Sequence, residues 1–196
     1  MKTIQKFKIQ IGVLFLATLF SSPLFAQTYN VSNKESKMEV LGTSSIHDWE
    51  IKAEQQKGDL ALEIENGNLK SIQNLDFTVI AESLKSGKGS MDKNTYKALN
   101  TGKYKEITYK LEKVTSIKNA SENNFKVDTR GYLTIAGTKK LVDITFDLKL
   151  GDKSIRLSGS KALKMSDFNI DAPTAMFGTI TTGDQITIKY NTIFTK

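Results

Sequence analysis

Alternation of apolar and polar side chains runs through most of this sequence and constrains its fold more than any other feature. In five segments an apolar residue occupies every second position, and mostly polar residues stand between. The apolar members are Leu60, Leu62 and Ile64; Phe77, Val79 and Ala81; Ile107, Tyr109 and Leu111; Ile144, Phe146, Leu148 and Leu150; and Ile186, Ile188 and Tyr190. Because successive side chains of a strand point to opposite faces, this pattern predicts strands that bury one face and expose the other.

Turn-forming residues separate the alternating segments. The short spacing between segments predicts hairpins, and therefore antiparallel neighbours. The predicted turns are Lys57-Gly58-Asp59, Asn66-Gly67-Asn68, Gly137-Thr138, Gly151-Asp152-Lys153 and Gly183-Asp184.

One stretch departs from the alternation. In residues 90–100, Met91, Thr95 and Leu99 recur at four-residue intervals, which is the spacing of one helix face. This pattern predicts a short helix, with Ser90 as a modest N-terminal cap.

Many antiparallel strands with a single helix are typical of a sandwich or a barrel. Residues 139–150 and 154–168 could each extend roughly 35–50 Å at about 3.3 Å per residue. A barrel of about eight strands of this length has room for a slender apolar ligand along its axis. We therefore predict an all-β protein, an extended antiparallel β-barrel of about eight strands with one short helical insertion.

The N-terminal segment has the layout of a secretory signal peptide. Lys2, Lys6 and Lys8 precede an apolar run over residues 11–20, and the segment 21–26, SSPLFA, then leads to Ala26. We expect residues 1–26 to be removed, leaving residues 27–196 as a single domain that is periplasmic or secreted. The alternative is an uncleaved N-terminal anchor, although the run is short for a membrane span. No cysteine follows it, so a lipid-modified N-terminus is excluded.

Composition excludes several classes of function. The 196 residues include no cysteine and one histidine, which excludes disulfides, thiolate sites and multi-histidine metal centres. Removing the three lysines of the signal segment lowers the formal net charge from +7 to +4. No block of basic residues remains, so we expect no nucleic-acid partner. We also expect no metal, no cofactor and no stable membrane anchor; a dimer is possible.

The single histidine, His47, allows three interpretations. On a strand it would share a face with Trp49, whereas Asp48 would point to the opposite face and could not orient it as in a catalytic relay. The sequence also contains no G-x-S-x-G nucleophile motif. His47 could therefore bond inside the barrel, contact the headgroup of a ligand, or act as an acid or base.

Aromatic and aliphatic side chains on the apolar faces are the candidate ligand-binding residues. The segment 168–178 is unusually apolar for a connection, and we place it near one opening of the barrel. Core packing and a ligand tunnel require the same inward face, so the pattern leaves both open. The candidate set is His47, Trp49, Phe77, Val79, Tyr109, Leu133, Phe146, Leu148, Phe168, Met176, Phe177 and Tyr190.

Three motifs in order resemble those of one family. Residues 129–140, TRGYLTIAGTKK, resemble the G-x-L-T-I-x-G-x-T/K-K hairpin of the YceI-like family, and residues 163–170, LKMSDFNI, resemble its L-x-x-x-D-F-N/G-I segment. Residues 96–107 resemble its helix followed by K-Y-P-x-I-x-F, with Lys105 where proline is usual. With residues 29–40, which resemble the opening strands, the similarity covers residues 29–194.

This resemblance implies a lipocalin-like barrel with an internal tunnel for a polyisoprenoid or similar amphiphilic lipid, in a periplasmic or secreted protein without a catalytic motif. We therefore expect an exported lipid-binding protein that is not an enzyme. Two alternatives stay open: an enzyme that acts on a lipid-like substrate with His47 as acid or base, and a ligand-free structural or stress-response barrel.

Overall fold

The computed structural model describes residues 27–196, and the predicted signal peptide lies outside the described residues. Most of the described chain is in strands. These are β1 (Gln27–Val31), β2 (Lys37–Ser44), β3 (Asp48–Ala53), β4 (Gln56–Glu65), β5 (Asn68–Ile80), β6 (Leu84–Lys85), β7 (Glu106–Ser121), β8 (Asn124–Ile135), β9 (Thr138–Leu150), β10 (Ser154–Lys164), β11 (Thr174–Ala175) and β12 (Ile180–Thr195). The helix α1 (Gly89–Leu99) and three short 3-10 turns, Ala81–Ser83, Ser166–Phe168 and Met176–Gly178, complete it.

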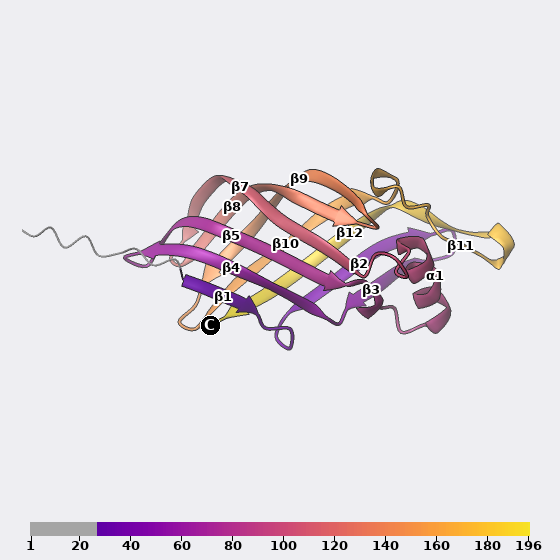
Figure 1. Cartoon of the computed structure of the whole chain (residues 1–196), viewed down its shortest axis with the longest axis horizontal. Helices are drawn as coiled ribbons and strands as arrows, with labels where there is room; N and C mark the ends of the chain where they lie inside the picture. Colours follow the sequence, from indigo (N-terminus) through magenta and orange to yellow (C-terminus); the bar gives the residue numbers. More distant parts are fainter. Residues whose placement is uncertain (1–26) are drawn as a thin grey trace, which may run out of the picture.

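Eight of these strands form a closed antiparallel ring (Figure 1). The order is β1, β4, β5, β7, β8, β9, β10 and β12, and β12 returns to β1 through the pairs Asn30–Thr195 and Val31–Phe194. This arrangement confirms the predicted all-β, lipocalin-like barrel of about eight strands. The predicted helix is also confirmed, one residue earlier than expected.

A branch of three strands widens one end of the ring. There β12 pairs with β2 instead of β1, β2 pairs with β3, and β3 pairs with β6. Figure 1 shows α1 and β11 at this end and the C-terminus at the other. The branch and α1 therefore build one end of the molecule differently from the rest of the barrel.

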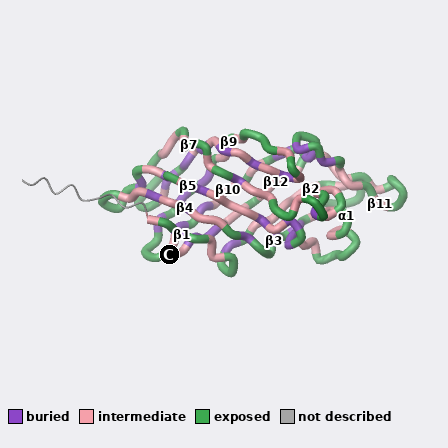
Figure 2. Tube along the Cα trace, viewed as in Figure 1, coloured by how far each residue is buried: buried purple, intermediate pink, exposed green. Residues whose placement is uncertain are grey.

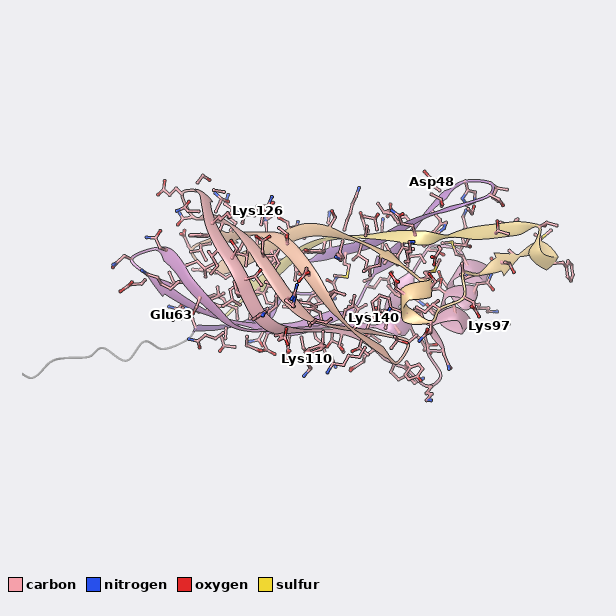
Figure 3. All side chains as sticks on the ribbon, turned by 90° about the horizontal axis from the view of Figure 1, so that it is seen from above. Asp48, Glu63, Lys97, Lys110, Lys126 and Lys140 are labelled. Atoms are coloured by element: carbon pink, nitrogen blue, oxygen red, sulfur yellow. The ribbon has the colours of Figure 1, made fainter. Side chains whose placement is uncertain are left out.

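The barrel is filled at the end that holds the C-terminus. The inner faces of its strands meet in a core of side chains that are almost completely inaccessible (Figure 2). The least exposed members that border no cavity are Leu60, Leu62, Val127, Leu148 and Ile155. Charged side chains such as Glu63, Lys110 and Lys126 project from the outer surface (Figure 3). This inside-outside division follows the alternation in the sequence, and it stabilises the barrel by burying apolar surface.

Two of the five predicted turns lie within strands. Gly58 is part of β4, where a side chain would collide with the Asp76 carbonyl of β5, so this glycine permits close strand contact. Gly183 lies in β12 at an irregularity in the pairing with β2. In these strands one glycine permits the close approach of a neighbouring strand and the other lies at a bulge. In the sequence, a glycine in either position cannot be told from a glycine in a turn.

The helix cap also differs from the prediction. Lys88, not Ser90, is the N-cap residue, and its side chain makes no capping bond. Instead, the Ser86 backbone N–H and hydroxyl donate to Asp92 Oδ1 at 2.8 and 2.6 Å. These bonds lower the pKa of Asp92 and attach the preceding loop to the first turn of α1. Within residues 27–196, no helix combines the length and apolar character needed to cross a membrane.

Candidate ligand-binding site

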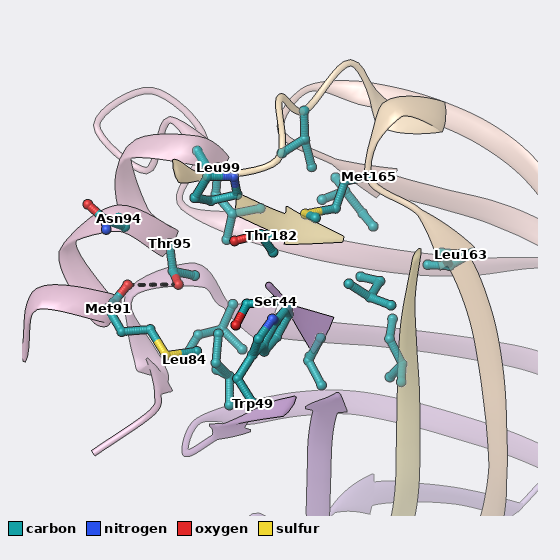
Figure 4. A pocket seen from close by; sticks show the side chains of 18 of the residues that line it. Ser44, Trp49, Leu84, Met91, Asn94, Thr95, Leu99, Leu163, Met165 and Thr182 are labelled. Carbon is teal, nitrogen blue, oxygen red and sulfur yellow. Dashed lines mark hydrogen bonds between the residues drawn. The ribbon is translucent and has the colours of Figure 1, made fainter. Parts of the chain in front are cut away.

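A cavity of about 310 Å³ lies at the wider end, between α1, the β2–β3 branch and the segment that connects β10 to β12 (Figure 4). Its walls are mostly aliphatic. Leu84, Leu99 and Leu163 come from three different elements and meet in this space. The helix contributes the face that carries Met91, Thr95 and Leu99, the same spacing that predicted it. The Thr95 hydroxyl donates to the Met91 carbonyl at 3.0 Å, so this polar group is satisfied within the helix.

The indole of Trp49 forms part of the cavity wall. Trp49 on β3 is paired with Gly42 on β2, and a side chain at position 42 would collide with the indole. The indole N–H donates to the Thr43 carbonyl at 2.9 Å. Glycine at position 42 therefore lets the ring lie flat over the neighbouring strand, and the hydrogen bond holds its orientation.

Polar groups stand around this cavity rather than in its depth. His47 is exposed, and its Nδ1 lies 2.8 Å from the carbonyl oxygen of Asp48. Since a carbonyl only accepts, neutral His47 carries its proton on Nδ1 and leaves Nε2 as an acceptor. Lys88 at the start of α1 and Lys164 at the end of β10 also line the cavity. The cavity thus combines an apolar interior with polar groups from separate loops.

A second cavity of about 120 Å³ adjoins the first along the barrel. Met38, Val79, Ile107 and Ile188 line both, and we call these four residues the waist. Beyond the waist the walls are again mainly apolar. They include Leu75, Phe77, Tyr109, Leu133, Phe146, Leu157, Tyr190 and Phe194.

Two tyrosines of the inner cavity direct their hydroxyls into the barrel wall. Tyr109 lies against Gly131 of β8, and its hydroxyl is 3.0 Å from Thr129 Oγ1. The Thr129 hydroxyl donates its own proton to the carbonyl of Ile144 at 2.8 Å. The Tyr109 hydroxyl is therefore the donor to Thr129. Tyr190 lies against Gly159 and donates to the β9 backbone at 3.3 Å. Burial raises the pKa of both tyrosines.

Beside this cavity, β9 and β10 separate. Their pairing runs from Leu150–Ile155 to Asp147–Ser158 and then ends. Beyond this point Lys161 of β10 donates to the Asp143 carbonyl of β9 at 2.8 Å. The methylene stem of Lys161 lines the inner cavity while its ammonium bonds to the opposite strand, so the charge is satisfied outside the apolar space.

The structure places most of the predicted site residues around these two cavities. His47, Trp49, Val79 and Phe168 line the outer cavity, and Phe77, Val79, Tyr109, Leu133, Phe146 and Tyr190 line the inner one. Leu148 belongs to the filled core, because its position on β9 lies beyond the inner cavity. Met176 and Phe177 are exposed and contribute to neither lining.

Several lining residues were not among the sequence candidates. Ile107, Ile186 and Ile188 share the inward phase of their strands, so alternation alone could have identified them. Met91 stood on the predicted helix face and Leu84 carried no pattern, but whether either reaches the cavity depends on how α1 and β6 pack at the end of the ring.

Comparison with known proteins agrees with this architecture. The sequence model of the YceI-like domain family matches residues 29–194, which is most of the chain. The chain belongs to the YceI-like family. This confirms the resemblance carried by the three motifs. A search of curated proteins finds no match.

Solved structures of other proteins share the fold of this YceI-like chain. BcnA of Burkholderia cenocepacia is 17% identical, with a TM-score of 0.65 over 83% of this chain and 98% of its own. A polyisoprenoid binding domain from Saccharophagus degradans, implicated in plant cell wall breakdown, is 11% identical, with a TM-score of 0.66 over 85% and 97%. The YceI protein of Campylobacter jejuni is 20% identical, with a TM-score of 0.52 over 72% and 81%.

Proposed function

We propose that this protein binds a polyisoprenoid or a similar long-chain amphiphile, with the apolar chain extending from the outer cavity through the waist into the inner cavity. The observation that carries this proposal is the pair of adjoining apolar cavities, the inner one within the closed ring of strands and the outer one at its wider end. Burial of each methylene contributes roughly 0.8 kcal/mol, so a few isoprene units offset a substantial cost of ordering the chain. The polyisoprenoid-binding domain of the same fold supports this choice of ligand.

The polar residues around the outer cavity supply the contacts for a headgroup. Lys88 and Lys164 present cationic side chains, and Nε2 of His47 offers an acceptor. An amphiphile bound in this orientation keeps its polar end hydrated and buries its apolar chain in the barrel.

We further propose that the protein is a carrier or binding protein and not an enzyme. The group that contacts Nδ1 of His47 is a backbone carbonyl of the next residue, which orients the ring but does not stabilise a positive charge as a carboxylate would. The enzyme alternative predicts that His47→Gln leaves binding intact and abolishes turnover of a lipid-like substrate.

Export to the periplasm or beyond is the part of the proposal that rests on the signal-like pattern of residues 1–26. Expression of the full chain in a bacterial host, followed by cell fractionation and N-terminal sequencing, tests it. A mature protein that starts near Gln27 outside the cytoplasm supports export, and an intact N-terminus in the membrane fraction supports the anchor.

Native mass spectrometry of the protein purified from its own host, with organic extraction of the same sample, tests the ligand. We expect a discrete additional mass that extracts as a long-chain lipid. Phe77→Asp, which places a charge in the inner cavity, should remove this mass, whereas Leu141→Asp on the exposed face of β9 should retain it. A folded protein that takes up no lipid when polyprenol is offered would contradict the proposal.

A further inference from the structure

Large apolar side chains are exposed together at the wider end of the barrel. Ile46 is 62% exposed, Met176 is 68% exposed, and Phe177 is fully exposed at 109%. They lie on two turns, one between β2 and β3 and one between β11 and β12. The remaining large hydrophobic side chain exposed in residues 27–196, Leu141 at 48%, lies on β9. We call Ile46, Met176 and Phe177 the apolar tip.

The two turns of the apolar tip are joined to one another. The Ser45 backbone N–H donates to the Thr181 carbonyl at 2.9 Å, and the Thr181 N–H donates to the Ser45 hydroxyl at 3.2 Å. Ser44 and Thr182 are paired just below this point. The tip is therefore a single surface at the end of the paired strands β2 and β12, and Figure 1 shows the β11 turn at the far end of the molecule.

The backbone of the second turn presents its large side chains to solvent. Met176 and Phe177 have φ of 50° and 55°, and Gly178 follows with φ of 91°. Methionine and phenylalanine rarely adopt this left-handed conformation, which asparagine and glycine accept more readily. The hydroxyl and backbone N–H of Thr179 both donate to the Met176 carbonyl, at 2.8 and 3.2 Å, and these bonds hold the turn.

The apolar tip borders the opening of the outer cavity. Ile46 is itself a lining residue, and so are Thr174, Ala175 and Ile180, which flank Met176 and Phe177 in the chain. Whatever contacts the tip therefore also faces the entrance through which a ligand would pass.

Two cationic side chains, Lys88 and Lys164, line the same opening. Lys93 and Lys97 are exposed on the face of α1 that points away from the cavity, and Figure 3 shows Lys97 there. Among the ion pairs formed within residues 27–196, none involves these four lysines. The carboxylates of Asp92 and Asp184 nearby accept hydrogen bonds from serine residues. Asp48 and Asp171 also face solvent at this end, so these four carboxylates equal the four lysines in number. The lining of the outer cavity itself, within residues 27–196, contains Lys88 and Lys164 and no carboxylate, so the charge at the opening is positive.

We propose that the apolar tip inserts into the surface of a phospholipid bilayer that contains anionic lipids, and that this contact places the outer cavity against the membrane. This inference rests on the proposed lipid-binding function. Aromatic side chains favour the interface between headgroups and acyl chains, and lysines flanking them pair with lipid phosphates. The apolar tip matches the interface with the acyl chains, and the lysines match the layer of lipid phosphates.

The size of the tip favours a membrane over a second copy of the chain. A phenylalanine buries roughly 150–250 Å², so the three side chains together offer on the order of 400–500 Å². A stable protein interface needs about 800 Å² from each partner. A bilayer requires no matching surface of fixed shape, so a small convex patch is sufficient for reversible binding.

Vesicle flotation tests the proposal. The purified protein, expressed from the full chain, is mixed with vesicles of phosphatidylcholine alone or of phosphatidylcholine and phosphatidylglycerol in equal parts. We expect the protein to float with the mixed vesicles, and added salt to weaken this binding. Phe177→Asp should lower the bound fraction by about tenfold or more, whereas Leu141→Asp, which places the same charge on another exposed hydrophobic position, should bind like the unsubstituted protein. Phe177→Ser, with circular dichroism of each variant, serves if the aspartate variant does not fold.

Uptake of a polyprenol from solution is measured separately, so that the two proposals fail independently. Protein that takes up polyprenol from solution but never floats would overturn membrane docking and leave the proposed function standing. Flotation that Phe177→Asp does not weaken would also overturn it. A dimer in sedimentation that Phe177→Asp disrupts, without any flotation, would assign the tip to self-association instead. Flotation that depends on Phe177 without polyprenol uptake would support docking and count against the proposed ligand.

Discussion

Closing the waist should separate long ligands from short ones. Ile188 on β12 lines both cavities and is only half-buried, so Ile188→Phe can extend its ring into the space between them. The larger ring blocks the route to the inner cavity without replacing a fully buried core residue. A ligand that fills both cavities should lose the inner part of its binding site, whereas a ligand confined to the outer cavity should lose little.

The inner volume sets the size of this effect. An empty apolar cavity costs roughly 24 cal/mol for each Å³. Filling about 120 Å³ is therefore worth about 3 kcal/mol. Since each 1.4 kcal/mol changes the dissociation constant tenfold, Ile188→Phe should weaken binding of a long polyprenol about a hundredfold.

The single tryptophan of the chain, Trp49, reports on this binding because it lines the outer cavity. Titration of its fluorescence gives dissociation constants for a long polyprenol and for a short one such as geraniol. Leu141→Phe, on the exposed face of β9, is the matched control and should change neither constant. Equal losses for both ligands in Ile188→Phe, or no loss for either, would refute the idea that the chain passes the waist.

Two further predictions concern the walls of the cavities. Gly42→Ala should displace the Trp49 indole and lower the free energy of unfolding, measured in urea, by about 1–3 kcal/mol. The control Gly102→Ala, where a Cβ meets open space, should leave the free energy of unfolding nearly unchanged. Similar values for the two variants would contradict the packing of the indole against Gly42. Burial raises the pKa of Tyr190, so its contribution to stability should be complete below about pH 10 and be lost as the pH rises toward its folded pKa. Tyrosinate absorbance should therefore show a late phase that shrinks in Tyr190→Phe, and an unchanged late phase would show that this hydroxyl is not buried.

The filled core and the cavity walls look alike in the sequence. Phe146 and Leu148 stand two positions apart on one face of β9, yet Phe146 borders the inner cavity and Leu148 lies in the filled core. Alternation predicts that both point inward, because it reports only which face of a strand is buried. How much space remains in front of each side chain depends on the residues that eleven other strands and a helix bring opposite to it.

The turns also contain features that the local sequence does not determine. His47 was placed on the face of a strand, but β3 begins at Asp48 and His47 stands exposed beside the cavity. Met176 and Phe177 lie beside an opening, as their segment was expected to, but the left-handed backbone of their turn directs their side chains into solvent and not into the cavity. Local composition does not reveal the backbone conformation that aims a side chain.

The sequence by itself determined the class of the fold, the helix, the inward phases of the long strands and the family, because each depends on local periodicity or on short motifs in order. Only the tertiary structure decided that the ring closes through β1 and β12, that the β2–β3 branch and α1 build a cavity at one end, and that the other end is filled. The physical reason is that closure and empty volume arise from pairings between residues far apart in the chain, which no local pattern records.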